Sequence, residues 1–382
     1  MTTLARLADI RSELNAEFYE RHDAVDALLY AALTRQHAFI LGPPGTGKSL
    51  MTRAFVERIV GATYFEQLLS KNRPDSAVLG PYDLPLLRDA GEFRRKDKGY
   101  LTDVHFAFLD EVGKASPTLG HDLLAALNER IKHQVGDASS VQSIPLHSAF
   151  TASNELPAQE SEDEAALWDR LLIRCVVDYI AGDASFKALL ERGAGAGKVT
   201  RITFEDLSEA ADEVAKVVLL DDVMDAVIAI RTALRKDGIT IGDRRWRESM
   251  KVVRASAWLD GRDVAALSDL RALRFTLWED LEQRQKIERT ILSVAAPHEA
   301  ELVALLDEVA ALNAQVAAME GQADDKLSEL YSKEVFGKVN VVDNQAKKIA
   351  ARLAKSGVTL DIQPVLDATN ALRDRGRAHM GI

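Results

Sequence analysis

The most constraining feature of this 382-residue chain is a glycine-rich loop between an apolar run and a helical stretch. The apolar run is Ala38–Leu41, and the helical pattern covers residues 50–60. Between them lie, in order, Gly42, Pro43, Pro44, Gly45, Thr46, Gly47, Lys48 and Ser49. A strand that leads into such glycines lets backbone N–H groups point at phosphate oxygens, and the following helix adds its positive N-terminal end. The loop predicts nucleotide binding on an α/β sheet.

The chemistry of the loop assigns a role to each polar side chain. We expect Lys48 to bridge the outer phosphates and the Ser49 hydroxyl to hold Mg²⁺, with Leu50 next to the bound nucleotide. The alternative is a plain glycine turn between strand and helix. The spacing of the glycines and the flanking elements favour the phosphate-binding interpretation.

A second polar element follows the apolar run Val104–Leu109. Adjacent carboxylates at the end of a strand place Asp110 beside a metal ion, directly or through water, and leave Glu111 to activate an attacking water. Acidic residues also cap helices, so the pair alone would be weak evidence. It lies about 60 residues after Lys48, and the combination predicts hydrolysis of a nucleoside triphosphate.

A third polar residue, Asn154, follows another apolar run. Its amide offers both a donor and an acceptor, so it could hydrogen-bond the attacking water or the γ-phosphate. The alternative is a turn residue after a strand. The two earlier motifs favour the catalytic interpretation.

Apolar runs alternate with helical patterns from about residue 12 to residue 180, which predicts a parallel sheet covered by helices. A helix is expected from Pro117, with an apolar face of Leu119, Leu123, Leu127 and Ile131. The expected strands are Ala38–Leu41, Thr63–Leu68, Val104–Leu109, Ser148–Thr151 and Ile173–Val177.

Changes in the pattern of apolar and polar residues along the chain divide it into three predicted parts. An α/β core is expected over residues 1–190, an α-helical lid over 191–284 and a helical C-terminal arm over 285–382. The lid should contain breaks at Asp237-Gly238 and Asp260-Gly261. Residues 193–198 imitate a second phosphate loop but lack its glycine spacing, so they are interpreted as a flexible connector.

The arm contains an apolar seam with 3-4 spacing between residues 302 and 319. A helical hairpin packing on itself is favoured over an intermolecular coiled coil, because coiled coils usually need more heptads. The tail from Val358 onward carries no assignable pattern. The seam comprises Leu302, Leu305, Val309, Leu312, Val316 and Met319.

Composition argues against several classes of partner, site and location for this protein. The net charge of −11 and the pI near 5.3 argue against nucleic acid as the main partner, since such binding depends on clustered Lys and Arg. The single Cys175 excludes an intrachain disulfide and a cysteine metal cluster, and the histidines lack metal-ligand spacing. No apolar run approaches the ~20 residues of a membrane span, and the N-terminus lacks a signal-peptide core. We expect a cytoplasmic protein without membrane insertion.

The ordered motifs carry a family resemblance. The loop Gly42–Ser49, the pair Asp110-Glu111, then Asn154 and the run 167–171 resemble the AAA+ ATPases, specifically their MoxR branch. The chain resembles the regulatory ATPase variant A (RavA) group most closely, over about residues 10 to 280. The resemblance to the RavA group is carried by residues 108–111, 127–130, 152–157 and 243–246.

The resemblance implies ATP and Mg²⁺ as cofactors and gives roles to several arginines. Arg170 matches the arginine finger that reaches a neighbouring subunit's nucleotide, with Arg174 as the nearby alternative. Arg244 matches the sensor-2 arginine of the lid, and Arg245 is close enough to be the true match. Residues 19–21 lie where this family's chain passes the adenine base.

The resemblance also implies two insertions that face a pore or a client protein. Residues 80–101 look like a hairpin-bearing insertion and residues 131–147 like the hairpin before sensor 1. The basic run Arg94–Lys98 is either a solvated loop tip or a contact for an acidic client. The β-rich segment that the RavA group often carries in its arm has no matching strand pattern here.

Together these features predict a Mg²⁺-dependent ATPase that forms a hexameric ring and remodels a protein partner. MoxR-type proteins typically work with a von Willebrand factor A (VWA) domain protein, so that partner is implied by the resemblance. Two alternatives remain: a nucleic-acid motor or loader, and a nucleotide-gated adaptor with slow turnover.

Overall fold

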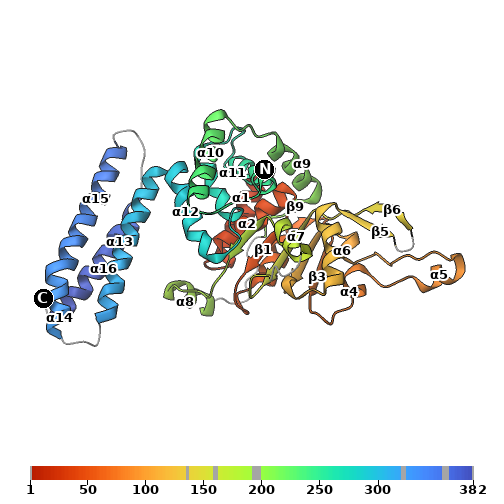
Figure 1. Cartoon of the computed structure of the whole chain (residues 1–382), viewed down its shortest axis with the longest axis horizontal. Helices are drawn as coiled ribbons and strands as arrows, with labels where there is room; N and C mark the ends of the chain where they lie inside the picture. Colours follow the sequence, from red (N-terminus) through yellow and green to blue (C-terminus); the bar gives the residue numbers. More distant parts are fainter. Residues whose placement is uncertain are drawn as a thin grey trace. The chain divides into compact units, whose positions relative to one another are not determined.

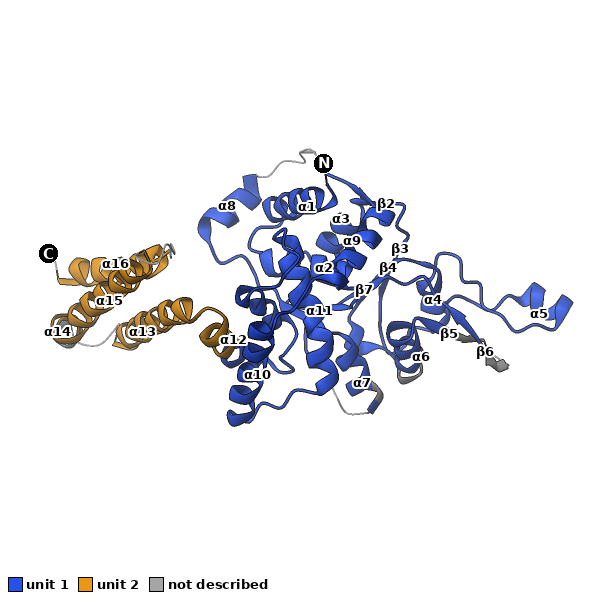
Figure 2. Cartoon of the chain, turned by 90° about the horizontal axis from the view of Figure 1, so that it is seen from above, with its two compact units in different colours: residues 1–287 blue, residues 288–382 orange. Residues whose placement is uncertain are grey.

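The computed structural model describes residues 2–134, 137–157, 162–191, 199–319, 324–354 and 361–380. The chain forms two compact units, residues 1–287 and residues 288–382 (Figure 2). The run of residues 193–198, expected to be a connector, lies outside the described residues.

The first unit is built on a five-stranded parallel sheet that is covered by helices (Figure 1). Its strand order is β3-β4-β7-β1-β8. Ala38 at the start of β1 pairs with Phe150 of β7 and Ile173 of β8. The residues of β1 and β7 are all buried, as expected for central strands with both faces covered. All five expected strands are confirmed. Their bounds are β1 Ala38–Leu41, β3 Tyr64–Leu68, β4 Phe106–Asp110, β7 Ser148–Ser153 and β8 Ile173–Val176.

Helices cover the sheet and connect its strands. Helix α6 begins at the expected Pro117, with the Ser116 hydroxyl accepting from Leu119 N, but it ends at Asn128. Ile131 therefore belongs to strand β5, which corrects its placement on the helix face. The chain turns at Arg130, whose φ is 53° and whose guanidinium donates to Leu146 O at 2.8 Å. The other helices of this part are α1 Thr3–Glu17, α2 His22–Thr34, α3 Lys48–Val56, α7 Glu162–Arg170 and α8 Asp183–Glu191.

Two insertions project from the sheet in the same direction in both views (Figures 1 and 2). The first contains α4, Ser76–Leu79, and α5, Leu84–Ala90. The second is an antiparallel hairpin of β5, Ile131–Gln134, and β6, Asp137–Ser143, which confirms the expected hairpin. Short 3₁₀ turns, η1 Leu101–Asp103 and η2 Val112–Lys114, flank β4.

The region after residue 199 is helical, as expected. It contains α9 Phe204–Lys216, α10 Asp221–Lys236, α11 Asp243–Leu259 and a 3₁₀ segment, η3 Leu267–Phe275. The expected breaks are present: α10 and α11 each end before an Asp-Gly pair whose glycine has a positive φ, 80° at Gly238 and 77° at Gly261. A two-residue strand, β9 Ile202–Thr203, pairs with β2, Ile59–Val60.

The second unit is a helical bundle. Its seam on α13, Pro297–Met319, is buried against helices of the same unit, which confirms packing within the chain. The unassigned tail forms α16, Gln363–Met380, and no strand occurs among the described residues after 288. The remaining elements are α14 Asp324–Leu330, a π-helical segment η4 Tyr331–Val335 and α15 Phe336–Ala354, while α12, Leu281–Ala295, spans the boundary between the units.

By length and composition alone, α13 is also apolar enough to cross a membrane, which the sequence analysis did not anticipate. Asp307 and Glu308 lie in the middle of this helix. Its seam residues, from Leu302 to Val316, are used in the bundle's own core.

Candidate nucleotide-binding site

The glycine-rich loop follows β1 at the carboxyl edge of the sheet, and its geometry requires glycine at three positions. Gly45 and Gly47 have φ values of 81° and 83°, in the left-handed region that favours glycine. A Cβ on Gly42 would lie 2.2 Å from the Val177 carbonyl oxygen. The loop can therefore pass this close to the end of β8 only without a side chain at residue 42.

Lys48, at the start of α3, folds back across the loop. Its Nζ donates to Gly42 O at 2.5 Å and to Pro43 O at 3.1 Å, and its third contact is Asn154 Oδ1 at 3.1 Å. Burial lowers the pKa of Lys48, and the nearby carboxylates of Asp110 and Glu111 oppose that effect. The ammonium group is thus held at the loop with its donors directed inward.

Asn154 connects Lys48 to Glu111. Its Nδ2 donates to Glu111 Oε1 at 2.7 Å, so the amide uses both its acceptor and its donor. Glu111 has a φ of 55° and is also contacted by Lys114 Nζ at 3.2 Å and by Ser153 Oγ at 3.4 Å. The carboxyl ends of β1, β4 and β7 therefore bring the three predicted motifs together.

Asp110 ends β4, and its Oδ1 accepts from Glu111 N at 3.0 Å. Burial raises the pKa of Asp110 above the usual carboxyl value. The hydrogen bond from Glu111 N and the charge of Lys48 oppose this effect but do not cancel it. Ser49 lies in the first turn of α3. One carboxylate and one hydroxyl fit Mg²⁺, which usually keeps several waters and takes further oxygens from phosphates. A bound cation would also offset the burial of the Asp110 carboxylate.

Residues 19–21 support the loop from the side. Arg21 is buried, and its Nε donates to Thr46 O at 3.3 Å. The Glu20 carboxylate accepts from Ala181 N at 2.8 Å and from Gly182 N at 3.0 Å, just before α8. Tyr179, which the sequence analysis did not identify, donates its hydroxyl to Pro44 O at 3.4 Å. Leu50 is 57% exposed beside the loop.

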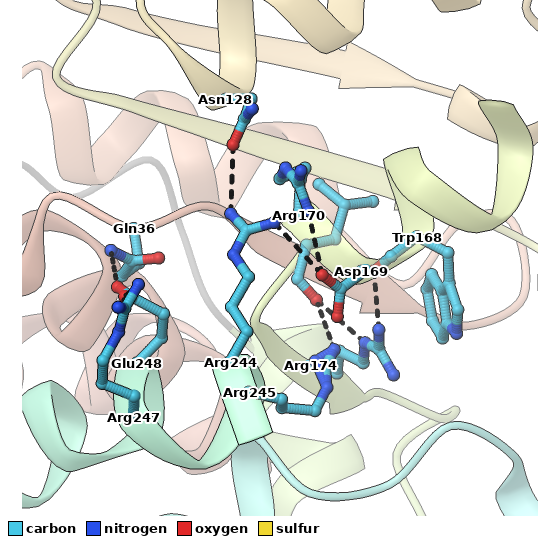
Figure 3. A network of polar contacts seen from close by, with 11 residues as sticks. Gln36, Asn128, Trp168, Asp169, Arg170, Arg174, Arg244, Arg245, Arg247 and Glu248 are labelled. Atoms are coloured by element: carbon cyan, nitrogen blue, oxygen red, sulfur yellow. Dashed lines mark hydrogen bonds and ion pairs between the residues drawn. The ribbon is translucent and has the colours of Figure 1, made fainter. Parts of the chain in front are cut away.

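The other predicted arginines lie at the opposite edge of the sheet. Arg170 precedes β8, and Ile173 at the start of β8 pairs with Ala38 at the start of β1, whereas Lys48 follows the end of β1. Arg244, at the N-terminus of α11, is beside Arg170 (Figure 3). A single subunit therefore does not bring Arg170 and Arg244 to its own loop.

Arg174 is buried, with 1% of its surface exposed, which corrects its assignment as the alternative finger. Its guanidinium donates to the backbone oxygens of Leu171, Trp168 and Trp278 and lies 3.6 Å from the centre of the Trp168 ring. A neighbouring subunit cannot reach it. Burial lowers its pKa well below the usual arginine value.

Arg245 is likewise enclosed, with 2% exposed and its Nη2 3.4 Å from Leu171 O. Burial lowers the pKa of Arg245 to about 10. Arg244 is the accessible member of the pair, with 41% of its side chain exposed, and the assignment of Arg245 to nucleotide binding stays a prediction.

In the basic run of the first insertion, both arginines and the one acidic residue form ion pairs. Arg94 contacts Glu92 at 3.0 Å, Arg95 contacts Asp75 at 2.6 Å and Asp97 contacts Lys132 of the hairpin. These pairs leave Lys96 and Lys98 as the members without an ion pair among the described residues. This pairing supports the solvated-loop interpretation of the run.

Comparisons with known proteins place these observations in a family. Residues 5–217 match a family described as the MoxR domain in the MoxR-vWA-beta-propeller ternary systems, and residues 222–291 match an AAA lid domain. The uncharacterized protein MJ0812 of Methanocaldococcus jannaschii is 34% identical over 352 residues, covering 90% of this chain and 92% of that protein.

Two more distant matches are consistent with this family and fold. Protein MoxR of Paracoccus denitrificans is 25% identical over 309 residues, covering 70% of this chain and 86% of that protein. A solved structure from Cytophaga hutchinsonii has a TM-score of 0.60 at 18% identity, covering 76% of this chain and 94% of that one, and so supports the fold alone. The phosphate-binding loop, the parallel sheet, the lid and these matches agree: the chain belongs to the MoxR family of AAA+ ATPases.

Proposed function

We propose that this chain is a Mg²⁺-dependent ATPase whose active site is completed by a second copy of the chain. The observation that carries the proposal is the separation of the site into two halves. The loop, Asp110, Glu111 and Asn154 share the carboxyl edge of the sheet, while Arg170 and Arg244 lie at the opposite edge. Head-to-tail contact between copies would bring the two halves together, and such contacts form a ring when the rotation between copies closes.

In the first half, Glu111 acts as the base that takes a proton from the attacking water. Asn154 donates to the Glu111 carboxylate at 2.7 Å and accepts from the Lys48 ammonium at 3.1 Å. It therefore orients the base relative to the terminal phosphate that Lys48 binds. Lys48 binds the outer phosphates. Ser49 and Asp110 would hold Mg²⁺, which would neutralise charge on the phosphate oxygens.

In the second half, Arg170 supplies the cation that stabilises charge on the transferred phosphoryl group of the neighbouring subunit. Arg244 acts from the same side, because it lies beside Arg170 and away from the subunit's own loop. Assembly is then a condition of turnover.

We further propose a hexameric cytoplasmic ring that remodels a protein partner, and a RavA-like affiliation within the family. The matching family is named for systems that contain a MoxR, a vWA and a β-propeller component, which supports a VWA-domain partner. The projecting α5 segment and the β5–β6 hairpin are the surfaces proposed to meet it. A nucleic-acid motor is disfavoured, because the net charge is −11 and both arginines of the densest basic run are paired with carboxylates.

The test is a mixing experiment with two inactive variants. Lys48→Ala removes the first half of the site, and Arg170→Ala removes the second. Mixed rings should regain activity at interfaces where an intact loop meets an intact finger. If rings demonstrably mix and no activity returns, catalysis across the interface is refuted. In parallel, the rate per subunit of the unmodified protein should rise with concentration as rings form.

A further inference from the structure

One carboxylate lies between the two arginines of the second half-site (Figure 3). Asp169 Oδ2 is 2.9 Å from Arg170 Nη1 and 3.3 Å from Arg244 Nη1. Arg170 ends α7 of the core, whereas Arg244 is the second residue of α11 and lies 75 residues after Asp169. A single oxygen atom therefore joins two arginines that the chain supplies from distant elements.

A second acceptor fixes the orientation of Arg244. Its Nη2 donates to Asn128 Oδ1 at 3.1 Å, while its Nη1 faces Asp169. Two acceptors on two different nitrogens restrict rotation of a planar guanidinium more than either would alone. Asn128 is the last residue of α6, so the Arg244 side chain is held between two separate core helices.

The charges explain why the carboxylate is needed. Two guanidinium groups close together repel each other, and a carboxylate between them offsets that repulsion. The three side chains keep a net charge of about +1, and each guanidinium has five N–H donors. The described contacts engage one nitrogen of Arg170 and two of Arg244. Arg170 Nε is buried, so the donors proposed for a phosphate from another molecule are the N–H groups on the exposed parts of the pair, where Arg244 is 41% and Arg170 20% exposed.

We propose that Asp169 is a positioning residue that holds Arg170 and Arg244 side by side as one anion-recognising pair before a neighbouring nucleotide arrives. This inference rests on the proposed function, because the pair acts on the terminal phosphate bound by a second copy. Asp169 does not touch the nucleotide. It lowers the cost of bringing both cations to the developing charge, since their arrangement is set in advance.

The first test compares Asp169→Asn with Asp169→Glu in the full-length ring. Asp169→Asn keeps the shape but removes the charge, so kcat for ATP should fall about tenfold, equivalent to about 1.4 kcal/mol. The KM for ATP should change less than about twofold, because the loop that binds ATP is at the other edge of the sheet. Asp169→Glu should recover part of the lost kcat. The matched control is Asp307→Asn, which removes a similarly exposed partner of Arg289 in the second unit.

The second test uses pairs of variants. Asp169→Asn subunits should regain activity when mixed with Lys48→Ala subunits, but not when mixed with Arg170→Ala subunits, because those two changes affect the same half-site. In one chain, adding Asp169→Asn to Arg170→Ala should cost much less than it does in the parent, since residues that act through one another are not additive.

The outcomes separate this inference from the proposed function. If Arg170→Ala and Lys48→Ala subunits mix without restoring activity, the proposed function fails. If they restore activity but Asp169→Asn keeps the parent kcat, positioning by Asp169 is refuted alone. Positioning is also refuted if Asp169→Asn loses kcat only together with a lowered melting temperature, with no recovery in Asp169→Glu, because the residue would then be purely structural.

Discussion

Replacing Asn154 by alanine tests the arrangement of the first half-site most directly. The change removes two hydrogen bonds, one at 3.1 Å from the Lys48 ammonium and one at 2.7 Å to the Glu111 carboxylate. Both partners carry charge in their active forms, so the orientation of the base and the placement of the lysine depend on the same amide. No other described side chain contacts both groups.

The magnitude follows from the energetics of such bonds. A hydrogen bond to a charged group contributes about 1.5–3 kcal/mol. Asn154 is exposed and water can replace part of what is lost, so we expect the equivalent of one such bond, about 1.5–3 kcal/mol, to be missing in the transition state. That loss corresponds to a fall in kcat of about 10- to 150-fold. Binding of ATP should weaken only slightly, since Lys48 keeps its contacts with the loop carbonyls.

The assay is steady-state ATP hydrolysis at ring-forming concentration, with nucleotide affinity measured separately by calorimetry on each variant. Asn313→Ala is the control, because it removes an exposed asparagine of the second unit that accepts from Arg375. A kcat within about threefold of the parent would refute the orienting role of Asn154. A large loss of ATP affinity at unchanged kcat would place its role in binding rather than in catalysis.

Three further predictions follow from the same structure. Glu111→Gln should bind ATP but lose at least about 100-fold in kcat. Mass measurement with ATP should find this variant trapped as a ring loaded with nucleotide. Hydrolysis at the parent rate would refute the role of Glu111 as the base. Arg174→Met should lower the free energy of unfolding by at least about 3 kcal/mol, because three backbone oxygens lose their buried donor. Denaturant titration measures this loss, and an unchanged unfolding midpoint would contradict the prediction. Burial lowers the pKa of His37 to about 3 and of His147 to about 4, below the usual 6.5. The unfolded chain therefore binds more protons below pH 6.5, and stability should be full above that pH and fall by about 1.4 kcal/mol per pH unit for each histidine down to those values; a flat profile in urea titrations between pH 7 and pH 5 would contradict it.

Features that depend on short runs of sequence were predictable. The five strands and the two Asp-Gly breaks follow from local apolar patterns and from glycine's access to positive φ. The meeting of the loop, Asp110-Glu111 and Asn154 was also predictable, because parallel strands end at one edge of the sheet. The domain boundaries at residues 190 and 284 stay predictions; the family matches end and begin at residues 217 and 222.

Features that depend on distant partners were not predictable. Arg170, Arg174, Arg244 and Arg245 look alike in the sequence, yet two are buried and two are accessible. What separates them is tertiary packing: Trp168 of α7 and Trp278, which follows η3, supply carbonyl acceptors to Arg174. Ile131 continued a helical spacing that the turn at Arg130 interrupts.

The sequence by itself determined the nucleotide-binding half of this protein, because a phosphate loop and the ends of parallel strands are specified by residues close together in the chain. Only the tertiary structure decided the other half. It placed Arg170 beside Arg244 with Asp169 between them, at the edge of the sheet away from Lys48. The physical reason is that burial and charge pairing depend on which distant elements pack together, and a one-dimensional pattern does not contain that information.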